Sequence, residues 1–223
     1  MSNLMLDVDQ AGELKAAFRR AEWTNGLIKQ LCESNLLIDL KKVLEGVAEI
    51  VVKSVLSVLK SVAIEAVAEK KTADCFTNKK RYAHRDADLD KLLPEVQAAQ
   101  SAVKITAHQL ARGAEFVEMV QGLFGTTETN IAALSRLAIE AGQVFTLTQI
   151  EVLIERQEAG EDAGLRIDGR GDNFFLVVNK ERGVSVVRAS RGNRMWYVYL
   201  DSLEDDSLWL AGSRFFSRNP LSF

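Results

Sequence analysis

Residues 196–219, WYVYLDSLEDDSLWLAGSRFFSRN, alternate in a way that predicts a β-strand followed by a polar turn. Successive side chains of a strand point to opposite faces. The two faces here are Trp196, Val198 and Leu200 on one side, and Tyr197, Tyr199 and Asp201 on the other. The first set is typical of a protein core. We therefore expect the second set to be presented on the surface.

The period of two extends upstream of this stretch as far as Gly164. The runs LRIDG, NFFLVVN, VSVVRAS and MWYVYLDSL predict strands, and the turn sequences GRGDN, NKERG and SRGN separate them. The first turn contains the tripeptide Arg170-Gly171-Asp172, which we interpret as turn chemistry rather than an adhesion motif. Residues 161–223 are thus expected to form a small β-rich domain.

The rest of the chain has the periodicity of helices, which makes the predicted fold class α+β. We expect an N-terminal helical region (1–70), a polar linker or loop (71–90) and a second helical region (91–160). Within the first region, residues 41–69 predict a long apolar helix that is buried or forms a homo-oligomer contact. Within the last, 92–120 predicts a long helix, and two shorter helices end at Gly142 and Gly160.

Composition restricts the class of protein. The chain has 223 residues, 47% of them hydrophobic, with a net charge of -3 and a pI of about 5.6. This is a globular composition, with no general attraction to nucleic acid or anionic lipid. The start of the chain lacks the pattern of a signal peptide, and charges interrupt its most apolar segment. We expect a cytoplasmic protein with no membrane span, in which Cys32 and Cys75 are free thiols.

Residues for catalysis are sparse. The two histidines, His84 and His108, lie in a polar loop and a predicted helix, and no spacing suggests a nucleophile with its base. The acidic turn DGRGDN lacks the spacing and the terminal Glu of a calcium loop. The sequence therefore predicts a protein that is not an enzyme and that uses no cofactor or metal.

The C-terminal run resembles the variable region of target proteins of diversity-generating retroelements. The resemblance rests on a short series of fixed positions with matching spacing, and the opening ELKAAFRRAEWTNGLIKQLCESN is also similar to the start of such proteins. The fixed positions are Trp196, Val198, Ser202-Leu203, Trp209, Ala211-Gly212 and Phe216-Ser217-Arg218-Asn219. The resemblance covers residues 6–50 and 140–219.

This resemblance implies a protein that binds ligands through a surface rewritten by an error-prone reverse transcriptase. In that family, adenines of a template repeat are misread, and Asn codons are the main substrates. The fold that the resemblance implies for residues 161–223 is C-type-lectin-like. The implied variable, ligand-binding residues are Tyr197, Tyr199, Asp201, Asp205, Ser207, Leu210 and Ser213. The implied scaffold residues are Trp196, Val198, Trp209, Gly212 and Phe216.

Two alternatives remain open. The chain could be a small intracellular regulator or phage-type inhibitor that binds one fixed protein. It could also bind nucleic acid through Arg188, Arg191 and Arg194 with the strand aromatics, although the acidic run after Asp201 argues against this. The basic loop around Lys79 and Lys80 is expected to be a solvated surface.

Overall fold

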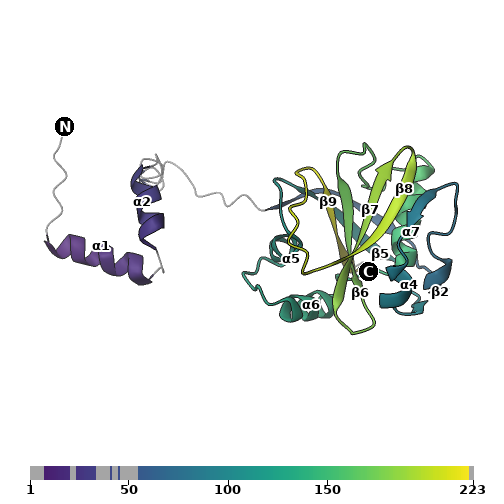
Figure 1. The fold of residues 1–223 in the computed structure, drawn as a ribbon, viewed down its shortest axis with the longest axis horizontal. Helices are drawn as coiled ribbons and strands as arrows, with labels where there is room; N and C mark the ends of the chain where they lie inside the picture. Colours follow the sequence, from purple (N-terminus) through teal and green to yellow (C-terminus); the bar gives the residue numbers. More distant parts are fainter. Residues whose placement is uncertain (1–7, 21–23, 34–40, 42–44, 46–54, 221–223) are drawn as a thin grey trace. The chain divides into compact units, whose positions relative to one another are not determined.

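The computed structural model describes residues 8–20, 24–33, 41, 45 and 55–220 (Figure 1). The chain divides into two compact units, Met1–Val52 and Lys53–Phe223. The sequence predicts four segments, and in the structure residues 53–160 belong to the same unit as the C-terminal strands. The fold class agrees at the coarse level: helices come first, and a mixed α/β unit with a β-rich C-terminal part follows.

The first unit contains α1 (Val8–Arg20) and α2 (Asn25–Glu33), close to the helices that the sequence predicts. Helix α2 begins directly after Thr24. Helix α1 has no buried residue, and it carries Asp9 in its first turn and Arg19 and Arg20 in its last. These charges complement the helix dipole.

The second unit is built on a seven-stranded sheet with the strand order β1-β5-β9-β6-β7-β8-β3. Neighbouring strands pair antiparallel except β6 with β9 and β3 with β8, which are parallel. A small separate sheet joins β2 and β4. The elements are β1 (Leu56–Ile64), β2 (Lys70–Lys71), a 3-10 turn (Thr72–Asp74), β3 (Tyr82–Arg85), α4 (Asp88–Leu92), β4 (Val96–Gln97), β5 (Val103–Leu110), α5 (Phe116–Phe124), α6 (Ile131–Glu140), α7 (Leu147–Glu158), β6 (Asp172–Val178), β7 (Val184–Gly192), β8 (Met195–Ser202) and β9 (Arg214–Pro220).

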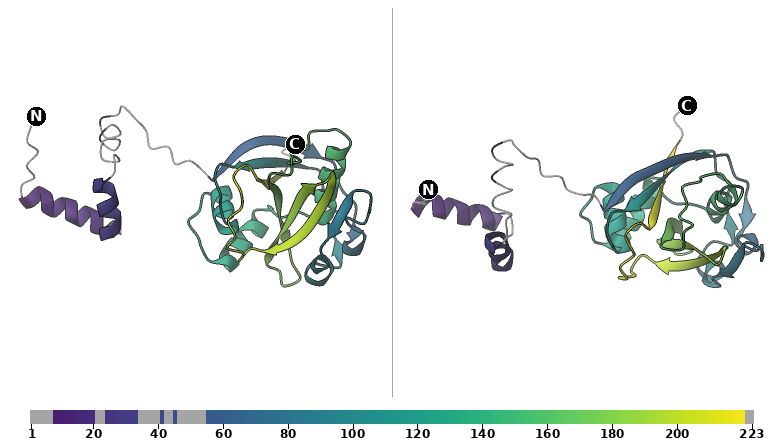
Figure 2. Two further views of the ribbon diagram at one scale, coloured as in Figure 1. Left: turned by 45° about the horizontal axis from the view of Figure 1, so that its top comes forward. Right: turned by 90° about the horizontal axis from the view of Figure 1, so that it is seen from above.

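Both faces of the sheet are covered, and each cover forms its own apolar core (Figures 1 and 2). Strand β6 shows why: Phe175 and Val177 pack with α7 on one face, whereas Phe174 and Leu176 pack with α5 and α6 on the other. All four side chains are buried. A strand covered on both sides reads as a continuous apolar run, as DNFFLVV does.

Helices α6 and α7 confirm the sequence prediction, and local chemistry explains their ends. The Asn130 side chain accepts a hydrogen bond from the Ala133 amide at the start of α6. Thr146 and Gln149 form a capping box at the start of α7. Gly142 and Gly160 follow the helices with positive φ angles of 65° and 90°.

The two predicted long helices are wrong over most of their described residues, although 116–120 is helical as part of α5. Of residues 41–69, those numbered 42–44 and 46–54 lie outside the described residues, and Leu56–Ile64 forms β1, which pairs with β5. Of residues 92–120, Val103–Leu110 forms β5. Both strands are rich in Val and Ile, which favour strands, and short apolar runs fit a helix and a strand equally well.

Residues 71–90 are not a linker. Cys75, Phe76, Tyr82 and Leu89 are buried in the core on the α7 side of the sheet. The carboxylate of Glu151 on α7 accepts a hydrogen bond of 2.9 Å from the Phe76 amide and pairs with Lys70. This segment is therefore an integral layer of the domain, and Cys75 is a buried free thiol.

Most of the strands predicted after Gly164 are present in the structure. The predicted strands 173–179, 184–190 and 195–203 are confirmed as β6, β7 and β8, whereas LRIDG (165–169) forms no strand. Strand β9 was not predicted. The tripeptide at 170–172 lies at a turn that leads directly into β6, as its composition indicated.

Candidate functional site

The hairpin of β7 and β8 determines which side chains reach the surface. Asn193 and Arg194 both have positive φ angles, 50° and 62°, as a tight two-residue turn of type I′ requires. The turn places Arg188 opposite Tyr199. Trp196 and Val198 are fully buried, as expected. The side chains on the other face of β8 are partly exposed: Tyr197, Tyr199 and Asp201.

Arg188 of β7 lies at the centre of this outer face. Its guanidinium carbon is 4.3 Å from the centre of the Tyr199 ring and 5.0 Å from that of Trp209. Its Nε and Nη2 donate hydrogen bonds to the two Asp201 carboxylate oxygens, at 2.8 and 3.3 Å. His84 of β3 contributes a ring 4.8 Å from that of Tyr199. The outer face is thus a connected cluster of rings and charges.

The loop after β8 is held by Trp209. Its backbone exchanges two hydrogen bonds with Ala114, of 2.9 and 3.2 Å, and its ring lies 5.3 Å from Phe116 and 5.0 Å from Phe174. The side chains on either side of an inward residue in extended backbone point outward. Accordingly, Leu208 and Leu210 are 68% and 66% exposed.

The end of the loop is closely packed. Gly212 has a φ of +83°, and a Cβ at this position would lie 2.1 Å from Nη1 of Arg166. Ser213 is only 1% exposed, and its hydroxyl accepts a hydrogen bond of 3.2 Å from the Asp172 amide. Ser213 was expected among the surface residues, and the structure corrects this: the loop has already turned into the sheet at this residue.

Asp205 and Ser207 lie in the loop after β8, and Phe216 lies in β9. Ser207 is exposed, and its amide donates to the Asp205 carboxylate at 2.9 Å. Hydrogen bonds from the Ser207 side chain and backbone, together with the charge of Arg188, lower the pKa of Asp205 below its ordinary value. Phe216, an expected scaffold residue, is fully buried and stacks on Phe175 with ring centres 4.4 Å apart.

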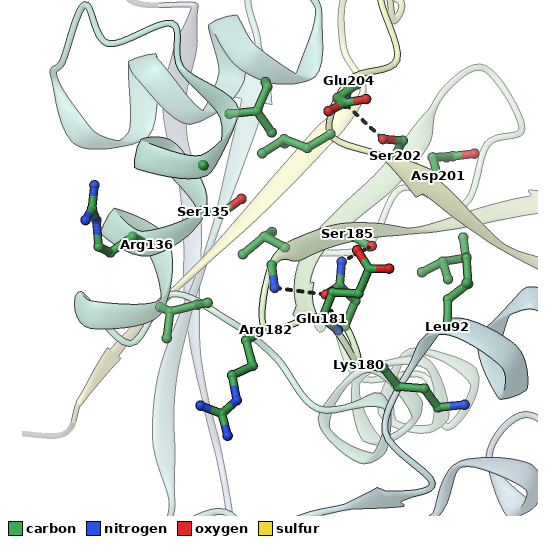
Figure 3. A pocket seen from close by; sticks show the side chains of 18 of the residues that line it. Leu92, Ser135, Arg136, Lys180, Glu181, Arg182, Ser185, Asp201, Ser202 and Glu204 are labelled. Atoms are coloured by element: carbon green, nitrogen blue, oxygen red, sulfur yellow. Dashed lines mark hydrogen bonds between the residues drawn. The ribbon is translucent and has the colours of Figure 1, made fainter.

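A groove of about 960 Å³ lies beside the end of β8 (Figure 3). Helix α6, the β6–β7 turn and residues 200–204 line it, so Asp201 borders both the groove and the Arg188 cluster. Its rim has charges of both signs, including Arg136, Arg182 and Glu204. The mixed rim favours a peptide or protein surface over a strongly charged polymer.

The structure brings together one pair with potential chemistry that the sequence did not indicate. Nε2 of His108 on β5 lies 2.8 Å from Oγ of Ser217 on the neighbouring strand β9. Burial lowers the pKa of His108 below its usual range, so the ring is neutral at physiological pH. Ser217 is only 4% exposed, however, and is not presented to a substrate. We interpret the pair as a cross-strand contact.

The described side chains of the site offer few features that would bind a metal ion or nucleic acid. Within the described ranges, no cluster of three or more His, Cys, Asp or Glu could hold a metal ion. Of the three arginines considered for nucleic acid, Arg188 pairs with Asp201, and Arg191 pairs with Glu158 at 2.9 Å. In the loop at 79–85, Arg85 pairs with Asp90. These pairs neutralise Arg188, Arg191 and Arg85, whereas Arg194, Lys79 and Lys80 are exposed.

Comparison with known proteins does not extend this picture. No family model matches the chain, and neither a curated protein nor a solved structure matches it. None of the described helices combines the length and apolar content needed to cross a bilayer. The site must therefore be interpreted from its own residues.

Proposed function

We propose that this chain is a non-enzymatic ligand-binding protein whose C-terminal surface is diversified by a retroelement. One observation carries the proposal: between residues 196 and 216, the division into scaffold and variable positions follows burial. Trp196, Val198 and Phe216 are fully buried, Trp209 packs on a core, and Gly212 has a φ of +83°, which disfavours any residue with a side chain.

The expected variable positions have the opposite character, apart from Ser213. Ser207 and Leu210 are exposed, and Tyr197, Tyr199, Asp201 and Asp205 are partly exposed. Substitution at these positions changes what a ligand meets and leaves the buried contacts of Trp196 and Trp209 in place. Large, rigid tyrosines beside small polar residues are also typical of surfaces selected for binding.

We further propose the C-type-lectin-like fold that the resemblance implies for residues 161–223, and we extend it to residues 103–220 on the strand pairing. The first and last strands of this stretch, β5 and β9, pair antiparallel. Three helices follow β5, and β6, β7 and β8 then form a continuous antiparallel run. The pairing of β9 with β5 places β9 inside the sheet, so the loop that precedes β9 ends at the centre of the domain. A loop displayed at this position is firmly supported. Strands β1 and β3 extend the sheet beyond this arrangement.

We further propose a protein ligand and a cytoplasmic location. A partly exposed aromatic cluster beside a groove of about 960 Å³ offers the mixture of apolar and polar area that protein interfaces use. The buried free thiol of Cys75 is compatible with a reducing compartment.

The groove favours a second candidate function. Its walls come largely from α6 and the β6–β7 turn, which lie outside the run expected to vary. A regulator or inhibitor with one fixed protein partner would use such a constant surface. The two functions differ in whether the codons of β8 and its loop vary within a population.

Deep sequencing of the 3′ end of the gene and its neighbourhood, across a population of the source organism, tests the proposal. We expect substitutions at codons 197, 199, 201, 205, 207 and 210, aligned with adenines of a nearby template repeat and accompanied by a reverse-transcriptase gene. Codons 196, 209, 212 and 216 should be constant. Codon 213 should accept only small residues, because Ser213 is buried. Constant codons throughout, with no repeat nearby, would replace the proposal with the fixed-partner function.

A further inference from the structure

Arg188 differs from the other residues of the candidate site in its origin. It belongs to β7, outside the run 196–219, yet it contacts Tyr199, Asp201 and Trp209. Its side chain is 21% exposed, so it is mostly buried and still reaches the surface. A retroelement acting on the run would change the neighbours of this arginine without changing the arginine itself.

An acid that balances its charge lies at an expected variable position. Asp201 accepts two hydrogen bonds from the guanidinium. Another acid, Asp172, lies on β6, where its charge acts on Arg188 and its carboxylate accepts a hydrogen bond from Ser190. The hydrogen-bonded counter-charge of Arg188 is therefore supplied by a residue that can be exchanged.

We propose that Arg188 is a masked binding site for a carboxylate of an acidic protein segment, and that the residue at 201 decides whether the site is open. With Asp at this position, the protein fills the site with its own carboxylate. With a neutral residue at 201, the same two nitrogens are available to a carboxylate of the ligand. The diversification of 201 rests on the proposed function, whereas the masked site is a property of this chain.

The geometry explains why the site would persist when Asp201 is replaced. The guanidinium lies over the rings of both Tyr199 and Trp209, and such cation–π contacts hold an arginine in position without an ionic partner. A planar guanidinium fork matches one carboxylate in a two-point contact, as Asp201 now demonstrates. A partly desolvated cation without a partner also gains more from such a contact than an exposed one.

The surroundings select a carboxylate over a phosphate polymer. Asp172 stays near the guanidinium, and Glu204 and Asp206 lie in the adjacent loop. A polyanion would meet these charges repeatedly, whereas a single carboxylate reaches only Arg188. The expected ligand is thus an acidic side chain on a protein surface.

The experiment uses the full chain, Asp201→Asn, and a short end-blocked peptide with a single glutamate as the probe. Binding is followed through the Arg188 Nε–H signal by NMR titration and through calorimetry. We expect Asp201→Asn to bind the peptide at least about tenfold more tightly than the starting chain. Adding Arg188→Gln should abolish the gain.

Asp206→Asn is the matched control, since it makes the same change of charge at an exposed position of the same loop. An equal gain for Asp206→Asn, or a gain that survives Arg188→Gln, would attribute the effect to net charge and overturn the proposal. Tighter binding of inorganic phosphate than of the peptide would overturn the assignment to a carboxylate. Asp201→Ser, checked with Asp201→Asn by near-UV circular dichroism, guards against misfolding of one variant. None of these results depends on the codon survey, so the two proposals can fail separately.

Discussion

The two faces of β8 carry side chains of similar size but opposite roles. Trp196 and Val198 are fully buried against α7, and the Trp196 indole donates a hydrogen bond of 3.0 Å to Glu158. Tyr197 and Tyr199, one residue further in each case, are partly exposed, and Tyr199 contacts only a surface cluster. The difference shows that one strand can carry both core residues and ligand-facing residues, because its side chains alternate between two faces.

The largest expected effect tests the inner face. Trp196→Ala removes a fully buried indole and should lower the free energy of unfolding by about 3–5 kcal/mol. Tyr197→Ala is the matched control on the outer face and should cost about 1 kcal/mol or less. Urea unfolding followed by far-UV circular dichroism measures both. Similar costs for the two variants would contradict the separation of the faces.

A second test concerns the loop that continues the outer face. Gly212→Ala combines a positive φ with a Cβ placed 2.1 Å from the Arg166 guanidinium, and it should cost about 2–3 kcal/mol. Gly160→Ala has a similar φ of +90° but open space around the Cβ, and should cost about 1 kcal/mol.

Thermal and urea unfolding compare the two glycine variants. Combining Gly212→Ala with Arg166→Ala should recover part of the loss by freeing the space that the guanidinium occupies. If Gly212→Ala is no more costly than Gly160→Ala, the close approach of Arg166 has no energetic role in holding the loop.

The smallest effect involves pH. Burial holds the pKa of His108 below its unfolded value of about 6.5, so the unfolded chain takes up a proton first on acidification. The contribution of His108 is complete above about pH 6.5 and declines as the pH falls toward the lowered pKa. His108→Gln should flatten the loss of unfolding free energy between about pH 7 and pH 5. A profile as steep for His108→Gln as for the starting chain would contradict this role of His108.

Much of the C-terminal arrangement was predictable from the sequence. The alternation in MWYVYLDS gave both faces of β8, and the caps Asn130 and Thr146 mark α6 and α7. Strands β1 and β5 were missed, since LSVLKSVAI satisfies helical spacing as well as strand propensity. In β5, Val103, Ile105 and Ala107 alternate with polar residues, a signal that could have identified the strand.

The centre of the candidate site was predictable in part. Arg188 could have been placed opposite Tyr199, because a two-residue turn at Asn193 and Arg194 fixes the pairing of β7 with β8. His84 could not, since β3 joins the edge of the sheet from a segment more than a hundred residues away in the sequence, which loop composition does not reveal. The burial of Ser213 likewise depends on the unpredicted strand β9.

The turn at Asn193 and Arg194 has a consequence for how this region can evolve. Side chains alternate along a strand, so an insertion or deletion of one residue in the hairpin would turn Trp196 outward and Tyr197 inward. Amino-acid substitutions that keep the length of the hairpin do not reverse the two faces, and the outward positions can accept them. Selection should therefore conserve the length of the hairpin more strictly than the identity of the outward-facing residues of β8. Point substitutions at these outward positions are the changes that the hairpin can accept.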